Sequence, residues 1–373
     1  MLNIFFGCCG LTSISVDRDN SHYDSRNNSN AIIETASNTL IVGCKNTTIP
    51  NGVTTIGENA FYGCSGLTSV TIPNSVTTIG EKAFYGCSGL TSVTIPNSVT
   101  SIENGAFMDC FCLSSVTIPN SVTSIGSRAF MDCFCLSSLT IGNSVKSIGR
   151  RAFMDCHSLT SITIDKKNNY YDSRNNCNAI IETASNTLIV GCKNTTIPNS
   201  VTTIGENAFF NCYGLTSITI PNSVNSIGIS AFFYCSGLTS ITIPNSVNSI
   251  GEDAFNYTYN LEEVVSLIEK HFEIQGLASY SSSFGTSAFE KATLYVPVGT
   301  INKYKATAGW QDFSHIVEGV PDAVEVMKAE NGLKADESLR DVYRLDGRRM
   351  AKVQRGINIV RDKNGATKKV LMR

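Results

Sequence analysis

Cysteine is the residue type that first suggests chemistry in this chain, because thiols form disulfides and bind metal ions. The 373-residue sequence has 14 cysteines. Eight share one position of a repeated pattern: Cys8, Cys64, Cys87, Cys110, Cys133, Cys156, Cys212 and Cys235. Equivalent residues of stacked coils point in parallel, which disfavours disulfides. We therefore expect a column of buried free thiols whose S–H groups meet backbone carbonyls.

The motif Cys-Phe-Cys occurs twice, at 110–112 and 133–135, and His157 follows one repeat later. Thiolate and imidazole ligands would suit zinc. The first cysteine of each motif belongs to the column, however, and the second, Cys112 or Cys135, takes a turn position where other coils carry glycine. We therefore predict no metal site here. Cys112 and Cys135 are either plain turn residues or a stacked pair that can oxidise.

Three aspartates, Asp109, Asp132 and Asp155, also recur every 23 residues, and a column of carboxylates could hold calcium. Arg128 and Arg151 stand four residues before two of them, so that solvated ion pairs are the simpler interpretation. The sequence has no GxSxG, HExxH or GxxxxGK[ST] motif. We predict no catalytic residue, no cofactor, no bound metal and no enzymatic activity.

All these residues are positioned by an internal repeat, which determines the expected architecture. The string LTSVTIPNSVTTIGEKAFYGCSG, residues 67–89, recurs almost unchanged every 23 residues. Its apolar residues alternate as in a short strand, return after a Pro-Asn turn, and take the spacing of one helical turn at Ala83, Phe84 and Cys87. One coil cannot bury them alone, but stacked coils form a continuous core. The expected structural ladder comprises Phe61, Phe84, Phe107, Phe130, Phe153, Phe209, Phe232, Phe255, Cys64, Cys87, Cys110, Cys133, Cys156, Cys212 and Cys235.

Two 33-residue insertions, near 15–48 and 163–196, interrupt the repeat with nearly identical sequences. Each contains NAIIE and NTLIVG around TAS, a pattern typical of a β-hairpin. The solenoid is expected over 1–258. Because Phe5 and Leu11 already fit the Phe and Leu columns, the chain should start inside a coil, as a sequence that has lost its N-terminal export signal would.

The distribution of charge indicates a second unit at the C-terminal end. Residues 321–373 contain 13 Lys and Arg and 8 Asp and Glu, a net charge of +5, whereas the rest of the chain carries −7. We expect a degenerate last coil and cap over 259–320, then a small basic β-module over 321–373 with turns at Asp346-Gly347 and Asn364-Gly365.

The pattern LxxIxIPxxVxxIGxxAFxxCxx resembles the BspA-like leucine-rich repeat of Bacteroidetes surface proteins. The final stretch, DVYRLDGRRM to the end, is similar to the short C-terminal module related to type IX sorting tails. The fold implied is mainly β: a leucine-rich-repeat solenoid of 23-residue coils with short helical turns, two hairpin insertions and a small C-terminal β-module. The resemblance also implies a non-enzymatic adhesion or protein-interaction protein at the cell surface or outside the cell.

The outward strand positions form the candidate binding face, a flat row of hydroxyl side chains. They are Ser69, Thr71, Ser92, Thr94, Ser115, Thr117, Ser138, Thr140, Ser161 and Thr163. Small and β-branched residues simply suit an exposed strand, but an extended solenoid face also suits a protein or glycan ligand. Ordering of ice is a third, weaker interpretation, and a passive structural spacer is the alternative function. The net charge of −2 argues against a nucleic-acid partner, and no apolar run is long enough for a transmembrane segment.

Overall fold

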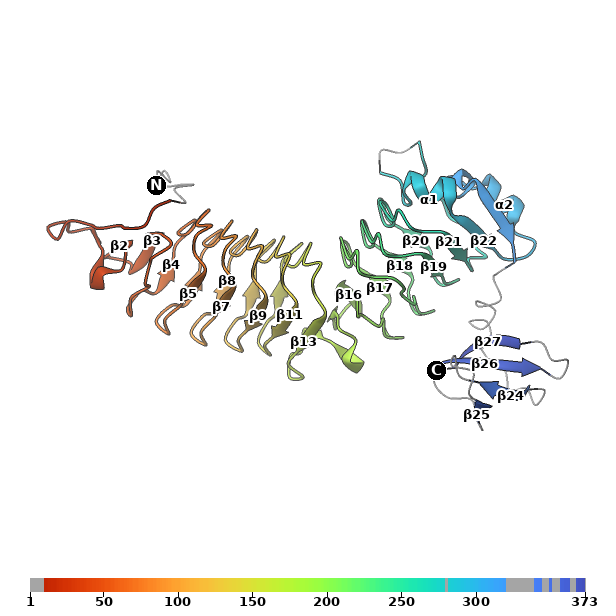
Figure 1. Ribbon diagram of the computed structural model, residues 1–373, viewed down its shortest axis with the longest axis horizontal. Coiled ribbons are helices and arrows are strands. Elements are labelled where there is room, and N and C mark those ends of the chain that lie inside the picture. Colours follow the sequence, from red (N-terminus) through yellow and green to blue (C-terminus); the bar gives the residue numbers. More distant parts are fainter. Residues whose placement is uncertain are drawn as a thin grey trace.

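The computed structural model describes residues 10–278 and 281–319, and the backbone of four strands within 339–372 (Figure 1). Several predicted features lie outside these residues: the Phe5 and Cys8 positions and the Asp346-Gly347 and Asn364-Gly365 turns. No helix among the described residues is long and apolar enough to cross a membrane.

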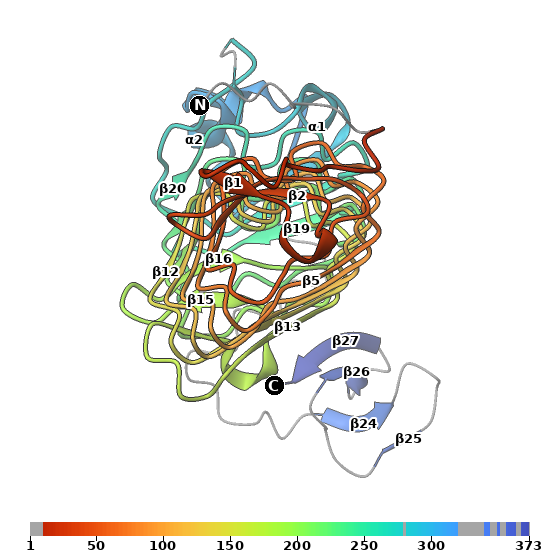
Figure 2. The ribbon, with the colours of Figure 1, turned by 90° about the vertical axis from the view of Figure 1, so that its left-hand side faces the viewer.

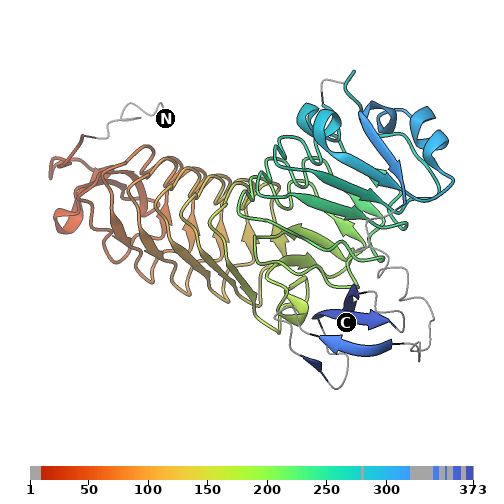
Figure 3. The same cartoon turned by 45° about the vertical axis from the view of Figure 1, so that its right-hand side comes forward.

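The array is built from two rows of short strands that run through stacked coils (Figures 1 and 3). The first row comprises β5 (Ser69–Thr71), β7 (Ser92–Thr94), β9 (Ser115–Ile118), β11 (Ser138–Ile141), β13 (Ser161–Ile164), β19 (Ser240–Ile243) and β21 (Glu263–Ser266), and all of these except β21 carry the Ser-x-Thr pattern. The second row consists of β4 (Thr55–Ile56), β6 (Thr78–Ile79), β8 (Ser101–Ile102), β10 (Ser124–Ile125), β12 (Ser147–Ile148), β17 (Thr203–Ile204), β18 (Ser226–Ile227) and β20 (Ser249–Ile250).

Neighbouring strands pair in parallel, and each residue faces its equivalent 23 positions along, as Ser138 faces Ser161 and Leu139 faces Ile162. Viewed along the stack, the coils superimpose (Figure 2). The expected fold class, a mainly β leucine-rich-repeat solenoid with a 23-residue period, is confirmed.

The segment between the second strand and the cysteine differs from the helical turn that its spacing predicts. The N–H of Ala83 bonds to Gly80 within the coil, but the N–H of Phe84 bonds to Ala106 of the next coil at 2.7 Å. Lys82 and Gly86 have left-handed backbones, with φ of 51° and 68°. Every second N–H group of this segment thus donates to a carbonyl of the neighbouring coil. An α-helix excludes this pattern because its N–H groups bond within the helix.

Each insertion forms the expected antiparallel hairpin with one further short strand: β1 (Tyr23–Asp24), β2 (Ala31–Glu34) and β3 (Thr39–Gly43), and then β14 (Tyr171–Asp172), β15 (Ile180–Glu182) and β16 (Thr187–Val190). The third strand of each set also joins the array, since β3 pairs in parallel with β4 and β16 with β17. Short 3₁₀ helices, η1 (Arg26–Asn28) and η2 (Arg174–Asn176), link the first two strands. The insertions therefore add a layer to the stack.

The second insertion divides the second strand row into two sheets and the interior of the array into two cores. The eight-stranded sheet ends at β12, and a new six-stranded sheet starts at β14. The phenylalanine ladder stacks continuously from Phe61 to Phe153 and again from Phe209 to Phe284, with ring centroids 4.9–5.4 Å apart. Between these two stacks, Gly191 of the insertion takes the position next to Phe209. Only glycine fits there, because a Cβ would lie 2.2 Å from the Phe209 ring.

The array ends in a cap of different composition (Figure 3). It comprises α1 (Thr286–Lys291), β22 (Thr293–Val296), α2 (Ile301–Ala306), η3 (Trp310–Asp312) and β23 (His315–Glu318). Tyr304 and Trp310 are buried, and their polar atoms donate hydrogen bonds to the carbonyls of Ile268 and Phe272.

Beyond the cap, four strands form an antiparallel sheet of their own in the order β25-β24-β26-β27. They are β24 (Leu339–Tyr343), β25 (Arg349–Met350), β26 (Gly356–Asp362) and β27 (Thr367–Met372). In the sequence, the segments DVYRL (341–345), INIV (357–360) and KKVLM (368–372) fall within or overlap β24, β26 and β27.

Candidate functional site

The hydroxyl face lies on the first strand row, where the side chains point outward from the core. Ser69, Thr71, Ser92, Thr94, Ser115, Thr117, Thr140 and Thr163 are exposed, and Ser138 and Ser161 are half-buried. The residues between them, such as Val116 and Leu139, are buried. The alternation follows from the two-residue period of a strand.

The hydroxyls of this face differ from those of the neighbouring row. Within the described residues, no protein group bonds to the side chains of Ser92, Thr94, Ser115 or Thr117, whereas Thr140 and Thr163 bond to each other at 3.0 Å. The residue directly before the serine of each Ser-x-Thr pattern, in contrast, has a bonded hydroxyl. The hydroxyls of Thr91, Ser114, Ser137 and Thr160 each donate to the carbonyl of the equivalent residue in the preceding coil at 3.0–3.1 Å. Free donors and acceptors are thus concentrated on the face itself.

A shallow groove of about 760 Å³ runs across this face over four coils. Ser92, Thr94, Ser115 and Thr117 line it together with Thr140 and Thr163, and Asn97, Asn120 and Asp165 stand along its margin. The groove is largely uncharged, so it can offer hydrogen bonds to a neutral polar ligand.

The predicted ladder positions lie inside the array. The eight phenylalanines and seven cysteines of the ladder are buried. The Sγ atoms of Cys87, Cys110, Cys133, Cys156 and Cys235 each donate to the backbone carbonyl of the ladder phenylalanine 26 residues earlier, in the preceding coil, at 3.1–3.3 Å. Burial raises the pKa of the Cys110, Cys133, Cys156 and Cys235 thiols well above the ordinary range, so these groups stay protonated.

The two remaining cysteines of the Cys-Phe-Cys motifs, Cys112 and Cys135, are exposed free thiols. His157 does not join them; its Nδ1 lies 3.2 Å from a carboxylate oxygen of Asp155. Among the described residues, no three His, Cys, Asp or Glu side chains are grouped so that they could hold a metal ion.

The interpretation of the aspartate column as a set of ion pairs is wrong. Arg151 pairs with Glu206 at 3.5 Å rather than with Asp155, and no ion pair joins Arg128 to Asp132 within the described residues. The four-residue spacing brings side chains together only on a helix. Here both arginines have left-handed backbones, with φ of 57° and 60°.

The aspartates instead neighbour one another. Burial, and then the charges of Asp155 and Asp109, raise the pKa of Asp132 to about 7. Asn211 donates to Asp155 at 2.6 Å, and Asp109 accepts from the Tyr85 hydroxyl, which raises the pKa of Tyr85. The column is therefore a hydrogen-bonded row whose central member is only partly ionised at neutral pH.

Sequence reasoning missed a second feature of the same turns, which we call the turn ridge: Phe111, Phe134, His157 and Tyr213. Their ring centroids are 4.9–5.0 Å apart, and the first three rings are nearly parallel. Because the rings stack face to face, Phe134 and His157 offer only their edges to solvent. The available signal was the replacement of the serine that other coils carry at this position, such as Ser65 and Ser88.

Comparison with known proteins places the repeat in a family. The BspA type leucine rich repeat region matches in six copies over residues 39–160, 80–187 and 173–284. The comparison with curated proteins gives no match.

Several solved structures are similar to this chain, and one of them reaches a TM-score of 0.50. A leucine-rich repeat protein from Eubacterium ventriosum superimposes with a TM-score of 0.50 at 21% identity, covering 69% of this chain and 74% of that one. A leucine rich cell surface protein from Faecalibacterium prausnitzii has a TM-score of 0.48 at 22% identity, and the match covers 84% of this chain and 96% of that one. A leucine-rich repeat protein from Bacteroides ovatus has a TM-score of 0.48 at 24% identity, and the match covers 82% of this chain and 88% of that one.

The matched repeats cover well over half of the 373 residues, and their period, core columns and solenoid fold agree with the structure. The chain therefore belongs to the BspA-type leucine-rich-repeat family.

Proposed function

We propose that this chain is a non-enzymatic interaction protein at the cell surface or outside the cell. In this proposal it binds a host or matrix protein or glycan through the hydroxyl face. The observation that carries the proposal is the 760 Å³ groove, in which the hydroxyls of Ser92, Thr94, Ser115 and Thr117 have no partner in the described part of the chain. Repeat proteins present such extended faces to macromolecular ligands, and the family assignment supports an interaction role.

The experiment fills the groove with bulk and charge. Thr94→Arg with Thr117→Arg places two long side chains in it, on exposed strand positions that leave the core untouched. The matched control is Ser217→Arg with Thr219→Arg, which changes two exposed residues of the outward Ser-x-Thr pattern in a coil outside the groove. Each protein is applied to a glycan array and to a panel of purified matrix proteins.

We expect the unmodified chain and the control to bind the same ligand, and the groove variant to lose that binding at least about tenfold, as steric exclusion from an interface core predicts. Equal binding by both variants would show that the hydroxyl face is not the binding surface. Absence of any saturable ligand would favour the alternative function, a passive spacer that displays another part of the protein.

We also propose the division into a solenoid over 1–258, a cap over 259–320 and a module over 321–373 that acts in sorting. Its support is the separate four-stranded sheet and the basic charge of that segment. Deletion of 321–373 should leave the thermal unfolding of the solenoid unchanged but abolish export from a host with the matching secretion apparatus. Loss of the folded solenoid would overturn this division.

A further inference from the structure

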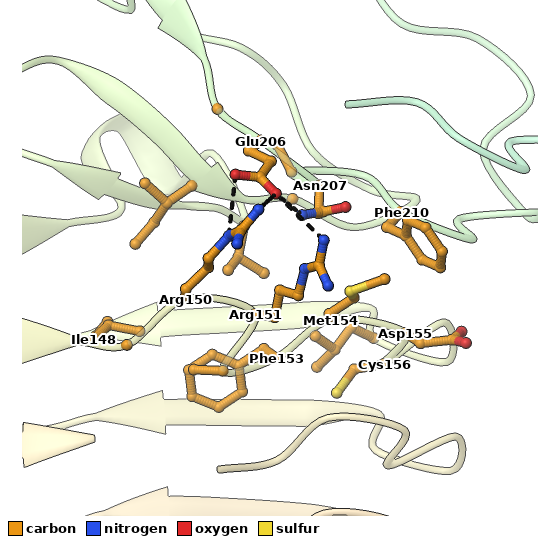
Figure 4. Close-up of a pocket in the computed structure, with 18 of the residues that line it drawn as sticks. Ile148, Arg150, Arg151, Phe153, Met154, Asp155, Cys156, Glu206, Asn207 and Phe210 are labelled. Carbon is orange, nitrogen blue, oxygen red and sulfur yellow. Dashed lines mark hydrogen bonds and ion pairs between the residues drawn. The ribbon is translucent and has the colours of Figure 1, made fainter. Parts of the chain in front are cut away.

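The second insertion leaves a pocket of about 220 Å³ in the turn region, between the coil of residues 149–156 and that of residues 205–212 (Figure 4). On the strand side, β16 and Gly191 fill the extra layer, and the N–H of Gly191 donates to the carbonyl of Ala208 at 2.7 Å. The insertion has no corresponding turn. One layer of turn is therefore missing, and the pocket takes its place.

The preceding coil shows what a complete layer does. There the backbone N–H groups of Arg128, Phe130 and Asp132 all donate to carbonyl oxygens of the next coil, at 2.8–3.1 Å. These three N–H groups point in one direction because the backbone alternates between right-handed and left-handed turns.

At the pocket the equivalent N–H groups differ from those of the complete layer. The residues 23 positions further, Arg151, Phe153 and Asp155, line the pocket, and no described residue accepts a hydrogen bond from their N–H groups. Arg151 and Asp155 keep the same left-handed backbone, with φ of 60° and 62°. A row of three N–H donors without a described acceptor therefore faces the pocket.

Two guanidinium groups reach across the same pocket (Figure 4). Arg150 bonds to Glu206 at 2.5 Å, while Arg151 is more loosely placed, with its Nη2 3.5 Å from the same carboxylate. The Nε of Arg151 is buried and has no hydrogen-bond partner among the residues that the structure describes. Asp155 turns away, toward Asn211 and His157.

We infer that this pocket is a binding site for a single oxyanion group, a carboxylate or a tetrahedral sulfate or phosphate, held by the N–H groups of Arg151, Phe153 and Asp155 and by the Arg151 guanidinium. Backbone N–H groups in such turns form anion-binding concavities, and charged donors strengthen the bonds. On the opposite wall only the carbonyls of Glu206 and Phe210 lack donors among the described residues, so donors predominate.

The site is separate from the hydroxyl face and does not depend on the proposed function. Its volume admits one anionic group rather than a chain of them, and Glu206 is the anion with which the ligand competes. Removal of the Glu206 charge should therefore strengthen binding, whereas removal of the Arg151 charge should weaken it.

The test measures amide hydrogen exchange of the full chain with sodium acetate, sodium sulfate or potassium phosphate, each against sodium chloride at equal ionic strength. The segment 150–156 should exchange faster than 127–133 in chloride, and the bound anion should slow 150–156 alone. A response to acetate identifies a carboxylate site, and a response only to sulfate and phosphate a tetrahedral one. Equal protection of the two segments in chloride, or no anion effect, would overturn the inference.

Two variants and a matched control complete the experiment. Arg151→Gln should raise the anion concentration needed for half-protection roughly 10- to 100-fold, as expected for the loss of a charged donor, and Glu206→Gln should lower it. Arg128→Gln, the same change one coil earlier, should leave it unchanged. If Arg151→Gln and Arg128→Gln act equally, or if Glu206→Gln weakens binding, the anion is not held in this pocket.

Discussion

The buried phenylalanine column and the turn ridge lie four residues apart in the same turns, yet they differ in how strictly the repeat is kept. Every coil from Phe61 to Phe255 carries phenylalanine at the column position, whereas the ridge position carries serine, phenylalanine, histidine or tyrosine. A column residue packs against identical neighbours above and below, so that one residue type satisfies every coil. A ridge residue faces solvent and is free to vary. The comparison indicates that the sequence of a solenoid separates stability from surface properties by position within the coil.

The largest expected effect is the difference in free energy of unfolding between two single substitutions in the same coil, one in the column and one in the ridge. Phe130→Ala removes a fully buried ring that stacks on Phe107 and Phe153, and should lower the free energy of unfolding by about 3–5 kcal/mol. Phe134→Ala removes a ridge ring and should cost about 1 kcal/mol or less. Urea denaturation of both variants measures the difference. Equal losses would show that the ridge is part of the core.

Thiol labelling of the folded protein should separate the same two regions. Cys112 and Cys135 are exposed and directly follow ridge phenylalanines in the sequence, whereas Cys87 and Cys110 are buried in the column. Because burial raises the pKa of Cys110, its reactive thiolate is scarce, and labelling should be at least about tenfold slower than at Cys112. Mass spectrometry of peptides from a timed iodoacetamide reaction measures the rates. Rapid labelling of Cys87 or Cys110 would contradict their inward orientation.

A smaller effect concerns the pH dependence of stability. The pKa of Asp132 is about 7 in the folded chain but about 4 when unfolded, so that the folded state holds the proton more tightly. Stability should therefore fall as pH rises from about 4 to about 7, and stay at the lower value above that range.

Asp132→Asn removes this titration and should flatten the melting temperature between pH 5 and pH 8 relative to the unmodified chain. Asp165→Asn, at the margin of the groove outside the column, provides the control. A variant that keeps the full pH slope would show that the aspartate column does not cause it.

Much of the fold could be predicted because the same pattern of apolar residues recurs in every coil. Val116, Phe107 and Cys110 recur in register, and only a stack of coils buries all of them. The predicted helical turn was wrong because the spacing of Ala83, Phe84 and Cys87 is shared by a helix and by a run of turns. Hydrogen bonds to the next coil decide between them, and one coil does not contain that information.

The candidate sites divide in the same way. The hydroxyl face follows from strand alternation, so its residues could be named from the sequence. The ion pairs expected at Arg128 and Arg151 could not be judged without the backbone, since left-handed residues direct the side chains elsewhere.

The sequence by itself determined the period, the buried columns, the two hairpins and the outward hydroxyl row, because these depend on contacts between identical neighbours. Only the tertiary structure decided the groove, the row of neighbouring carboxylates and the pocket at the second insertion. These features depend on how different parts of the chain meet in the folded stack of coils. At Gly191 the insertion completes the strand layer but not the turn layer, and that mismatch leaves the N–H groups of Phe153 and Asp155 facing the pocket.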